Sequence, residues 1–143
     1  MEGFSPAANN NKGAILAVLA KWLPKQAKLL EIGSGAGQHA IHMAGELKHI
    51  HWQPSDRASV LPMLTSNVAA YGSANILTPI TLDLAEDIWP AETFHCAYSA
   101  NVMHIVSSEL GEKLIRGAAM ALAEDGLLAL FAGWEPIIVG YFI

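Results

Sequence analysis

The segment 31–37 reads Glu-Ile-Gly-Ser-Gly-Ala-Gly, which places glycines at Gly33, Gly35 and Gly37. It follows the apolar run 28–32, which is typical of a buried strand that ends in a sharp turn. Glycines between a strand and a helix allow a tight turn and let the backbone approach a ligand at the helix N-terminus. A turn that needs glycine for its own geometry has the same composition, so the neighbouring residues must decide whether a ligand binds.

Residues beside these glycines discriminate between ligands. The dinucleotide fingerprint Gly-x-Gly-x-x-Gly requires its third glycine at position 38, where this chain has Gln38. Glu31 lies in an apolar strand, where a carboxylate is costly unless it is paired or functional. An acidic residue followed by Gly-x-Gly-x-Gly resembles the first motif of class I S-adenosylmethionine-dependent methyltransferases, so a nicotinamide-dependent oxidoreductase is disfavoured. Ser34 belongs to the same candidate cofactor-binding segment.

Acidic residues follow the next two predicted strands. Asp56 comes after the strand predicted at 49–54 and can accept hydrogen bonds from both hydroxyls of a ribose. Alternatively, Asp56 caps the helix predicted at 59–71. Asp83 ends the strand predicted at 76–83, where the resemblance implies an acceptor for the adenine amino group and an ordinary loop acid is the alternative. Both acids are therefore candidate contacts of a nucleoside.

Asn101 and His104 follow the strand predicted at 93–99. The resemblance places this segment beside the sulfonium and the methyl acceptor, with Asn101 near the sulfonium. Histidine has an unperturbed pKa near neutrality, so His104 is a candidate general base, and a structural histidine is the alternative. Alignment of methyl donor and acceptor can itself supply roughly 7–11 kcal/mol of the barrier, so a strong base is not essential.

The elements that must position these residues alternate along the chain. We expect strands at 28–32, 49–54, 76–83, 93–99 and 127–131, and helices from Pro6 to before Pro24, after the glycines, at 59–71 and over Leu110, Leu114, Ala118 and Leu122. This alternation implies an α/β fold with a doubly wound, mostly parallel Rossmann-like sheet and helices on both faces. Ligands of such sheets bind beyond the carboxyl ends of the strands.

The resemblance extends beyond the superfamily. Five segments carry it in order, namely 5–12, 30–39, 52–56, 82–83 and 101–105. Together they resemble an uncharacterised methyltransferase-like family, a domain of unknown function, and the segment Trp-Gln-Pro-Ser-Asp is the most specific of them. The resemblance implies a class I fold and S-adenosylmethionine as the cofactor, and it implies no particular methyl acceptor.

The chain departs from that family in two places. Asn10 stands where members usually carry arginine, and members continue well past the fifth predicted strand, so we expect a truncated or frameshifted domain. The final residues 137–143 are β-branched and aromatic, and Gly133 to Pro136 have turn composition. This pattern predicts that 137–143 folds back antiparallel on 127–131, or else leaves an exposed edge through which the chain self-associates.

Composition sets the remaining limits. At 143 residues the chain has the length of a single domain, 1–143, with no signal peptide or uninterrupted membrane span, so we expect a cytoplasmic protein without membrane contact. Its 8 Lys and Arg are scattered and outnumbered by 13 Asp and Glu, which disfavours binding of duplex nucleic acid through a basic patch. Cys96 is a single cysteine and is interpreted as a small buried hydrophobe.

Other polar and aromatic residues have less specific interpretations. His39, His42 and Glu46 share one helix, but zinc helices more often use histidines four residues apart, so a solvated helix face is favoured and no metal site is expected. His39 can still approach the cofactor, because it lies two residues past Gly37. Trp52 either packs under the adenosine or fills the core, with the core favoured.

These patterns predict an enzyme that transfers a methyl group from S-adenosylmethionine to an unidentified acceptor. The alternative is a non-catalytic module, derived from a truncated methyltransferase fold, that binds the cofactor or a partner. Methyl transfer from labelled cofactor distinguishes the two, because both hypotheses share the same cofactor site.

Overall fold

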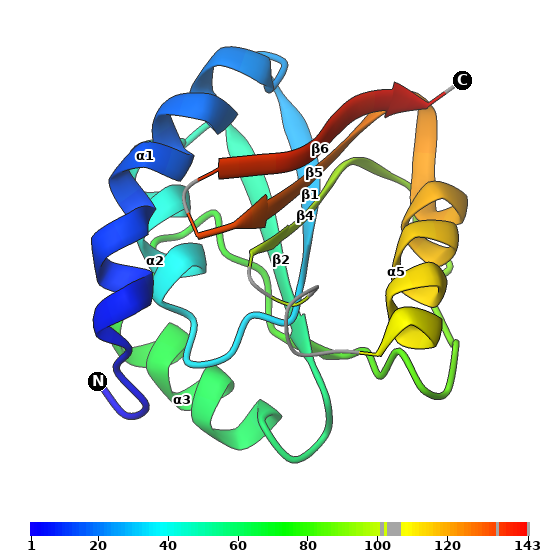
Figure 1. The fold of residues 1–143 in the computed structure, drawn as a ribbon. Helices are drawn as coiled ribbons and strands as arrows, with labels where there is room; N and C mark the ends of the chain where they lie inside the picture. Colours follow the sequence, from blue (N-terminus) through cyan, green and yellow to red (C-terminus); the bar gives the residue numbers. More distant parts are fainter. Residues whose placement is uncertain (101, 103–106, 134, 143) are drawn as a thin grey trace.

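The computed structural model describes residues 1–100, 102, 107–133 and 135–142, and the described residues form one mixed sheet (Figure 1). The strands, in the order in which they lie in the sheet, are β3 (Ile80–Thr81), β2 (Ile50–Asp56), β1 (Ala27–Ile32), β4 (Phe94–Ala100), β5 (Leu122–Ala132) and β6 (Glu135–Phe142). The first five of these strands pair in parallel, and β6 pairs antiparallel with β5. The predicted doubly wound, mostly parallel sheet is therefore confirmed.

Helices cover both faces of this sheet. The helices are α1 (Pro6–Trp22), α2 (Gln38–Glu46), α3 (Leu61–Tyr71) and α5 (Ser108–Ala121). Figure 1 shows α1 and α2 on one side of the strands and α5 on the other. The apolar stripe of α1, with Ile15 and Leu19, packs on the first face, whereas Leu114 and Ala118 of α5 pack on the second. Within the described residues, no helix is long and apolar enough to cross a membrane.

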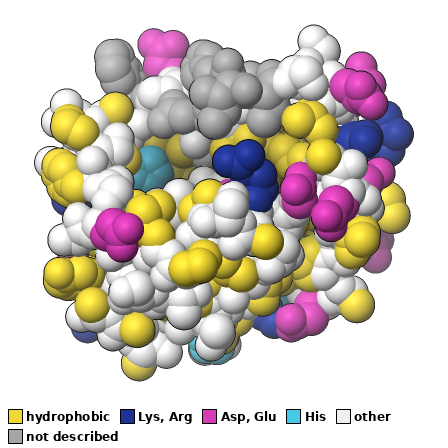
Figure 2. Space-filling model, turned by 90° about the horizontal axis from the view of Figure 1, so that it is seen from below, with side chains coloured by type: hydrophobic (Ala, Val, Ile, Leu, Met, Phe, Trp, Pro, Cys, Tyr) yellow, Lys and Arg dark blue, Asp and Glu magenta, His cyan; other side chains and the backbone are white. Residues whose placement is uncertain are grey.

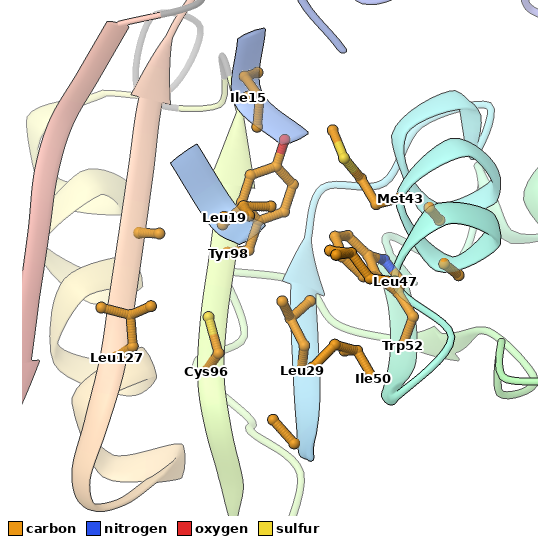
Figure 3. Packing of buried hydrophobic residues seen from close by; sticks show 14 of the residues in the cluster. Ile15, Leu19, Leu29, Met43, Leu47, Ile50, Trp52, Cys96, Tyr98 and Leu127 are labelled. Atoms are coloured by element: carbon orange, nitrogen blue, oxygen red, sulfur yellow. The ribbon is translucent and has the colours of Figure 1, made fainter. Parts of the chain in front are cut away.

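Aromatic rings fill the core of the first face. Tyr98 points from β4 toward α1 (Figure 3) and is fully buried. Its ring meets the Trp52 ring edge-on at 5.6 Å and lies 5.7 Å from the Phe131 ring. Cys96, on the same face of β4, is also fully buried, and burial raises the pKa of its thiol far above the ordinary value. The interpretation of Cys96 as a buried hydrophobe and the preference for Trp52 in the core are both confirmed.

The edge strand before residue 83 is shorter than the sequence predicts. A strand was expected over 76–83, but β3 contains only Ile80 and Thr81, joined to β2. Farther upstream, a single bridge joins Trp52 to Ile76. Pro79 lacks an N–H to donate to a ladder, and the carbonyl of Thr78 accepts instead from the side chain of Gln53 at 2.8 Å. The polar side chain of Gln53 thus replaces a strand pairing.

The chain end forms the opposite edge of the sheet. In the register of β6 on β5, Leu127 lies opposite Tyr141, and Leu130 lies opposite Ile138. Gly133, in the connecting turn, has φ +61°, a left-handed conformation that glycine adopts without strain. The prediction that the tail folds back antiparallel is confirmed for the described residues. β5 itself begins at Leu122 rather than 127, because Leu122 already pairs with Phe94.

Candidate functional site

The glycine loop between β1 and α2 has the geometry that only glycine adopts freely. Gly33, Gly35 and Gly37 have φ values of +73°, +57° and +88°. A Cβ on Gly33 would lie 2.5 Å from the side chain of Val102, so this glycine also allows a close approach. A Cβ on Gly35 would meet no atom within 4 Å, which means that the loop faces open space there. The loop is thus strained for any other residue and open on one side.

A cavity of about 320 Å³ lies against this loop at the carboxyl ends of β1 and β4. Glu31, the glycine loop, His39 and Ala100 form its inner wall, and Gly3 and Ser5 form part of its outer wall. Figure 2 views the molecule from this side and shows hydrophobic side chains interspersed with acidic and basic ones. The volume of the cavity lies within the range of small-molecule sites, which is about 300–1,000 Å³.

Glu31 is the buried charge-bearing group of this cavity. Its side chain is 3% exposed, and Oε1 accepts a hydrogen bond from Nε1 of Trp52 at 3.1 Å. Burial raises the pKa of Glu31 to about 7, against the opposing hydrogen bonds of Trp52 and Ser34, and the nearby charge of Asp56 raises it further. Among the described residues, the ion pairs do not include Glu31. A cationic ligand group would therefore find an uncompensated carboxylate here.

Asp56 ties the end of β2 to the glycine loop. Its Oδ2 accepts from the backbone N–H of Gly35 at 2.8 Å, and its Oδ1 accepts from the N–H of Arg57 at 2.7 Å. The alternative that Asp56 caps the following helix is wrong, because α3 begins at Leu61 with Val60 as its N-cap residue. Each carboxylate oxygen has a second lone pair, so both bonds leave capacity to accept from ribose hydroxyls.

The other predicted site residues are Asp83, Asn101 and His104, of which the structure describes only Asp83. Asp83 is half-buried, and its Oδ1 accepts from the N–H of Ala85 at 2.9 Å, which is the local loop contact considered as the alternative. Asp83, like Gly37 and Asp56, is not among the residues that line the cavity, and its role toward adenine stays a prediction. Asn101 and His104 lie outside the described residues, although Val102 between them packs beside the glycine loop.

His39 belongs to a buried network that the sequence did not predict. Its Nδ1 lies 2.9 Å from the hydroxyl of Tyr98, and its Nε2 lies 2.8 Å from Oδ1 of Asn11 and 3.2 Å from the carbonyl of Ala8. Burial lowers the pKa of His39, so the ring is neutral at pH 7. Because both partners of Nε2 are acceptors, Nε2 carries the proton and Tyr98 donates to Nδ1.

The expectation of a solvated face is therefore wrong for His39, which is 7% exposed. The reason is that α1 packs over this end of α2 and covers the imidazole. The signal was available in the sequence, because His39 lies one helical turn before the buried Met43 and so shares its face. With both nitrogens engaged, His39 forms a fixed wall of the cavity rather than a free base.

A glycine loop after the first strand, an acid after the second and a parallel sheet closed by an antiparallel edge give the chain the fold of class I methyltransferases. The S-adenosylmethionine-dependent methyltransferase SibL, solved in its apo form, is similar with a TM-score of 0.74 and 20% identity over 86% of this chain. Coclaurine N-methyltransferase, bound to N-methylheliamine and SAH, gives 0.69 and 17% over 91%. An O-methyltransferase family 2 protein from Planctomyces limnophilus, in complex with apigenin, gives 0.67 and 18% over 87%.

A family profile classifies this chain more narrowly than these distant structures do. The profile described as "Protein of unknown function (DUF938)" matches residues 2–136, so the chain belongs to that family. The chain spans only 35%, 37% and 40% of the lengths of SibL, the coclaurine enzyme and the Planctomyces protein. At these identities the likeness establishes the shared fold.

Proposed function

We propose that this chain binds S-adenosylmethionine in the cavity beside the glycine loop and transfers its methyl group to an acceptor. The observation that carries the proposal is Glu31, a buried carboxylate without a cationic partner among the described residues, which opens onto a cavity walled by left-handed glycines. The amino group of a methionine moiety would supply the missing positive charge.

The residues of the site fit the parts of this cofactor. Glu31 would hold the ammonium group, and the turn made by Gly33, Gly35 and Gly37, of which the first two line the cavity, would let the backbone approach the methionine moiety. Asp56 would accept from the ribose, Asp83 from the adenine amino group, and Asn101, by its place in the sequence, would lie near the sulfonium. When bound, the cofactor supplies a methyl group activated by the positive sulfur.

The chain's own contribution to such a transfer is mainly alignment. A held donor and acceptor can gain roughly 7–11 kcal/mol over free reactants in solution. His104 is the candidate base that would take a proton from the acceptor, a contribution of about 10²–10⁴-fold. His39 would hold the cavity wall in one position, because both of its ring nitrogens are engaged.

The second candidate function is a cofactor-binding or interaction module without catalysis. Such a module would keep the glycine loop, Glu31 and Asp56, all of which precede the short edge strand β3.

Calorimetric titration with S-adenosylhomocysteine tests the cofactor proposal. Binding of S-adenosylhomocysteine and no binding of NADH are expected, and Glu31→Gln should abolish the former while the fold is kept. Tight NADH binding without a response to S-adenosylhomocysteine would overturn the proposal. Incubation of lysate with methyl-labelled cofactor then separates the two candidates, since only the enzyme transfers label to an acceptor.

A further inference from the structure

Residues 2–5, here called the strap, lie across the glycine loop before α1 begins. The backbone of Glu2 donates to Oδ1 of Asn67 at 3.3 Å and accepts from Nδ2 of the same side chain at 2.8 Å. The backbone of Ser5 donates to Oε1 of Gln38 at 2.6 Å and accepts from Nε2 of Gln38 at 3.2 Å. Two side-chain amides, one on α2 and one on α3, therefore hold the two ends of the strap.

The strap is also a wall of the candidate cofactor cavity. Gly3 and Ser5 line that cavity, while Asn67 additionally donates to the carbonyl of Ala36 in the glycine loop at 2.9 Å. The outward side of the strap is open to solvent, and Phe4 is 56% exposed. A single thin layer of chain thus separates this side of the cavity from water.

The strap differs from α1 in how it is attached. Ile15 and Leu19 anchor α1 with fully buried side chains, and Asn11 is 5% exposed. The strap has no buried residue, and apart from the bonds of Ser5 to the first turn of α1, the described residues hold it through the four hydrogen bonds of Gln38 and Asn67. Segments with few buried apolar contacts open locally at low cost while the rest of the fold stays intact.

We propose that the strap is the removable wall of the cofactor pocket and that Gln38 and Asn67 are positioning residues that hold it closed. This inference rests on the proposed function, because the ligand that enters and leaves is S-adenosylmethionine or its demethylated product. It also explains the residue at position 38. A glycine there, as in the dinucleotide fingerprint, would have no amide with which to hold Ser5.

Stopped-flow release of S-adenosylhomocysteine tests the proposal, with the fluorescence of buried Trp52, bonded to Glu31, as the signal. Gln38→Ala removes both hydrogen bonds to Ser5, so the open strap becomes about tenfold more populated and the release rate rises by about the same factor. Gln38→Glu keeps an acceptor for the N–H of Ser5 but loses the donor, so a smaller increase is expected. Ser73→Ala, which removes a side-chain bond to Asn75 away from the cavity, is the matched control and should leave the rate unchanged.

A second variant perturbs the strap without touching α2. Gly3 has φ +72°, and a Cβ there would lie 2.6 Å from the sulfur of Met63, so Gly3→Ala strains the closed strap. Faster release of S-adenosylhomocysteine and faster hydrogen exchange at the amide of Ser5 are expected, with a melting temperature close to that of the wild type. A purely structural role for Gly3 would lower the melting temperature and leave the release rate unchanged.

The outcomes distinguish a failure of the proposed function from a failure of the strap inference alone. If the wild-type chain does not bind S-adenosylhomocysteine, the proposed function fails and the strap inference fails with it. If the wild type binds, and Gln38→Ala and Gly3→Ala both release ligand at the wild-type rate, only the strap inference fails. Should Gln38→Ala not fold, Gly3→Ala alone decides between these results.

Discussion

Two regions of the same sheet bury opposite kinds of side chain at similar depth. At the carboxyl ends of β1 and β2, Glu31, Gln53 and Ser55 are each no more than 4% exposed, and each is hydrogen bonded. In β5, the stretch Leu127 to Phe131 is equally buried and carries only apolar side chains. The difference in polarity between the two regions is therefore not a difference in solvent exposure.

The difference lies in what each region must do. Burial of apolar surface stabilises β5 and the helix against it, whereas burial of polar groups at β1 and β2 costs free energy that their hydrogen bonds only offset. A carboxylate such as Glu31 would be replaced by an apolar residue if stability alone mattered. Under the proposed function, the polar end is the binding region and the apolar region of β5 supports it. Substitutions in the two regions should consequently change different quantities.

The largest effect is expected in the apolar half. Leu130 is fully buried, and Leu130→Ala should lower the free energy of unfolding by about 2–5 kcal/mol, because it leaves a cavity in the second core. The affinity of the folded fraction for S-adenosylhomocysteine should stay unchanged. Urea denaturation measures the first quantity and calorimetry the second. Met120→Ala, at a side chain that is 79% exposed on α5, is the control and should change stability by less than about 0.5 kcal/mol.

Substitution of Glu31 should raise the free energy of unfolding above neutral pH, whereas substitution of Leu130 lowers it. Its pKa is raised from 4.5 to about 7 in the folded protein, so the folded state favours the protonated acid. The stability that this group contributes is complete below pH 4.5 and is lost as the pH rises to about 7, a loss of about 3 kcal/mol. Glu31→Gln removes that loss, so the variant should be more stable than the wild type at pH 8, with little difference at pH 4.5.

Thermal unfolding from pH 4.5 to 8 measures this difference, and binding must be measured on the same samples. The comparison between the two regions predicts a variant that gains stability and loses affinity for S-adenosylhomocysteine. Equal stability of the two proteins at pH 8 would mean that another group compensates the charge of Glu31. Burial of this carboxylate would then cost no free energy of folding.

A smaller effect on binding alone is expected at Asp56. Asp56→Ala removes an acceptor for ribose hydroxyls and should weaken S-adenosylhomocysteine binding by about 1–3 kcal/mol. Asp56→Asn keeps one acceptor oxygen for the N–H of Gly35 and should recover part of the affinity. A lower melting temperature with unchanged affinity would show that Asp56 only braces the glycine loop.

The sequence predicted those parts of the site that depend on local pattern. The strands, the glycine loop with its three left-handed residues and the folded-back tail follow from composition over a few neighbouring residues. Other parts of the site join residues far apart in the sequence. Trp52 bonds Glu31 across 21 positions, and Gln38 bonds Ser5 across 33. The network around His39 joins residues 28 or more positions apart.

Such pairings depend on how helices pack on the sheet, which periodicity does not specify. The solvated-face interpretation of His39 failed for this reason, because it considered α2 without α1 above it. The overlong third strand failed for a related reason. Its residues have strand propensity, but Pro79 and the side chain of Gln53 occupy the positions where ladder bonds would form.

The smallest effect is expected at the edge of the apolar half. β6 is the outermost strand, and its outer backbone edge has no partner strand within the described part of the sheet. Apart from Glu135 and Pro136 at its start, β6 has none of the charges or prolines that protect edge strands, so we propose weak self-association of the chain through this edge. Light scattering should show a mass that rises with protein concentration, and Val139→Lys should suppress the rise without changing S-adenosylhomocysteine affinity.

Amides of β6 that pair with β5 should exchange slowly in both proteins. A monomer at every concentration would limit the edge to intramolecular pairing, and fast exchange along β6 in such a monomer would contradict the pairing itself.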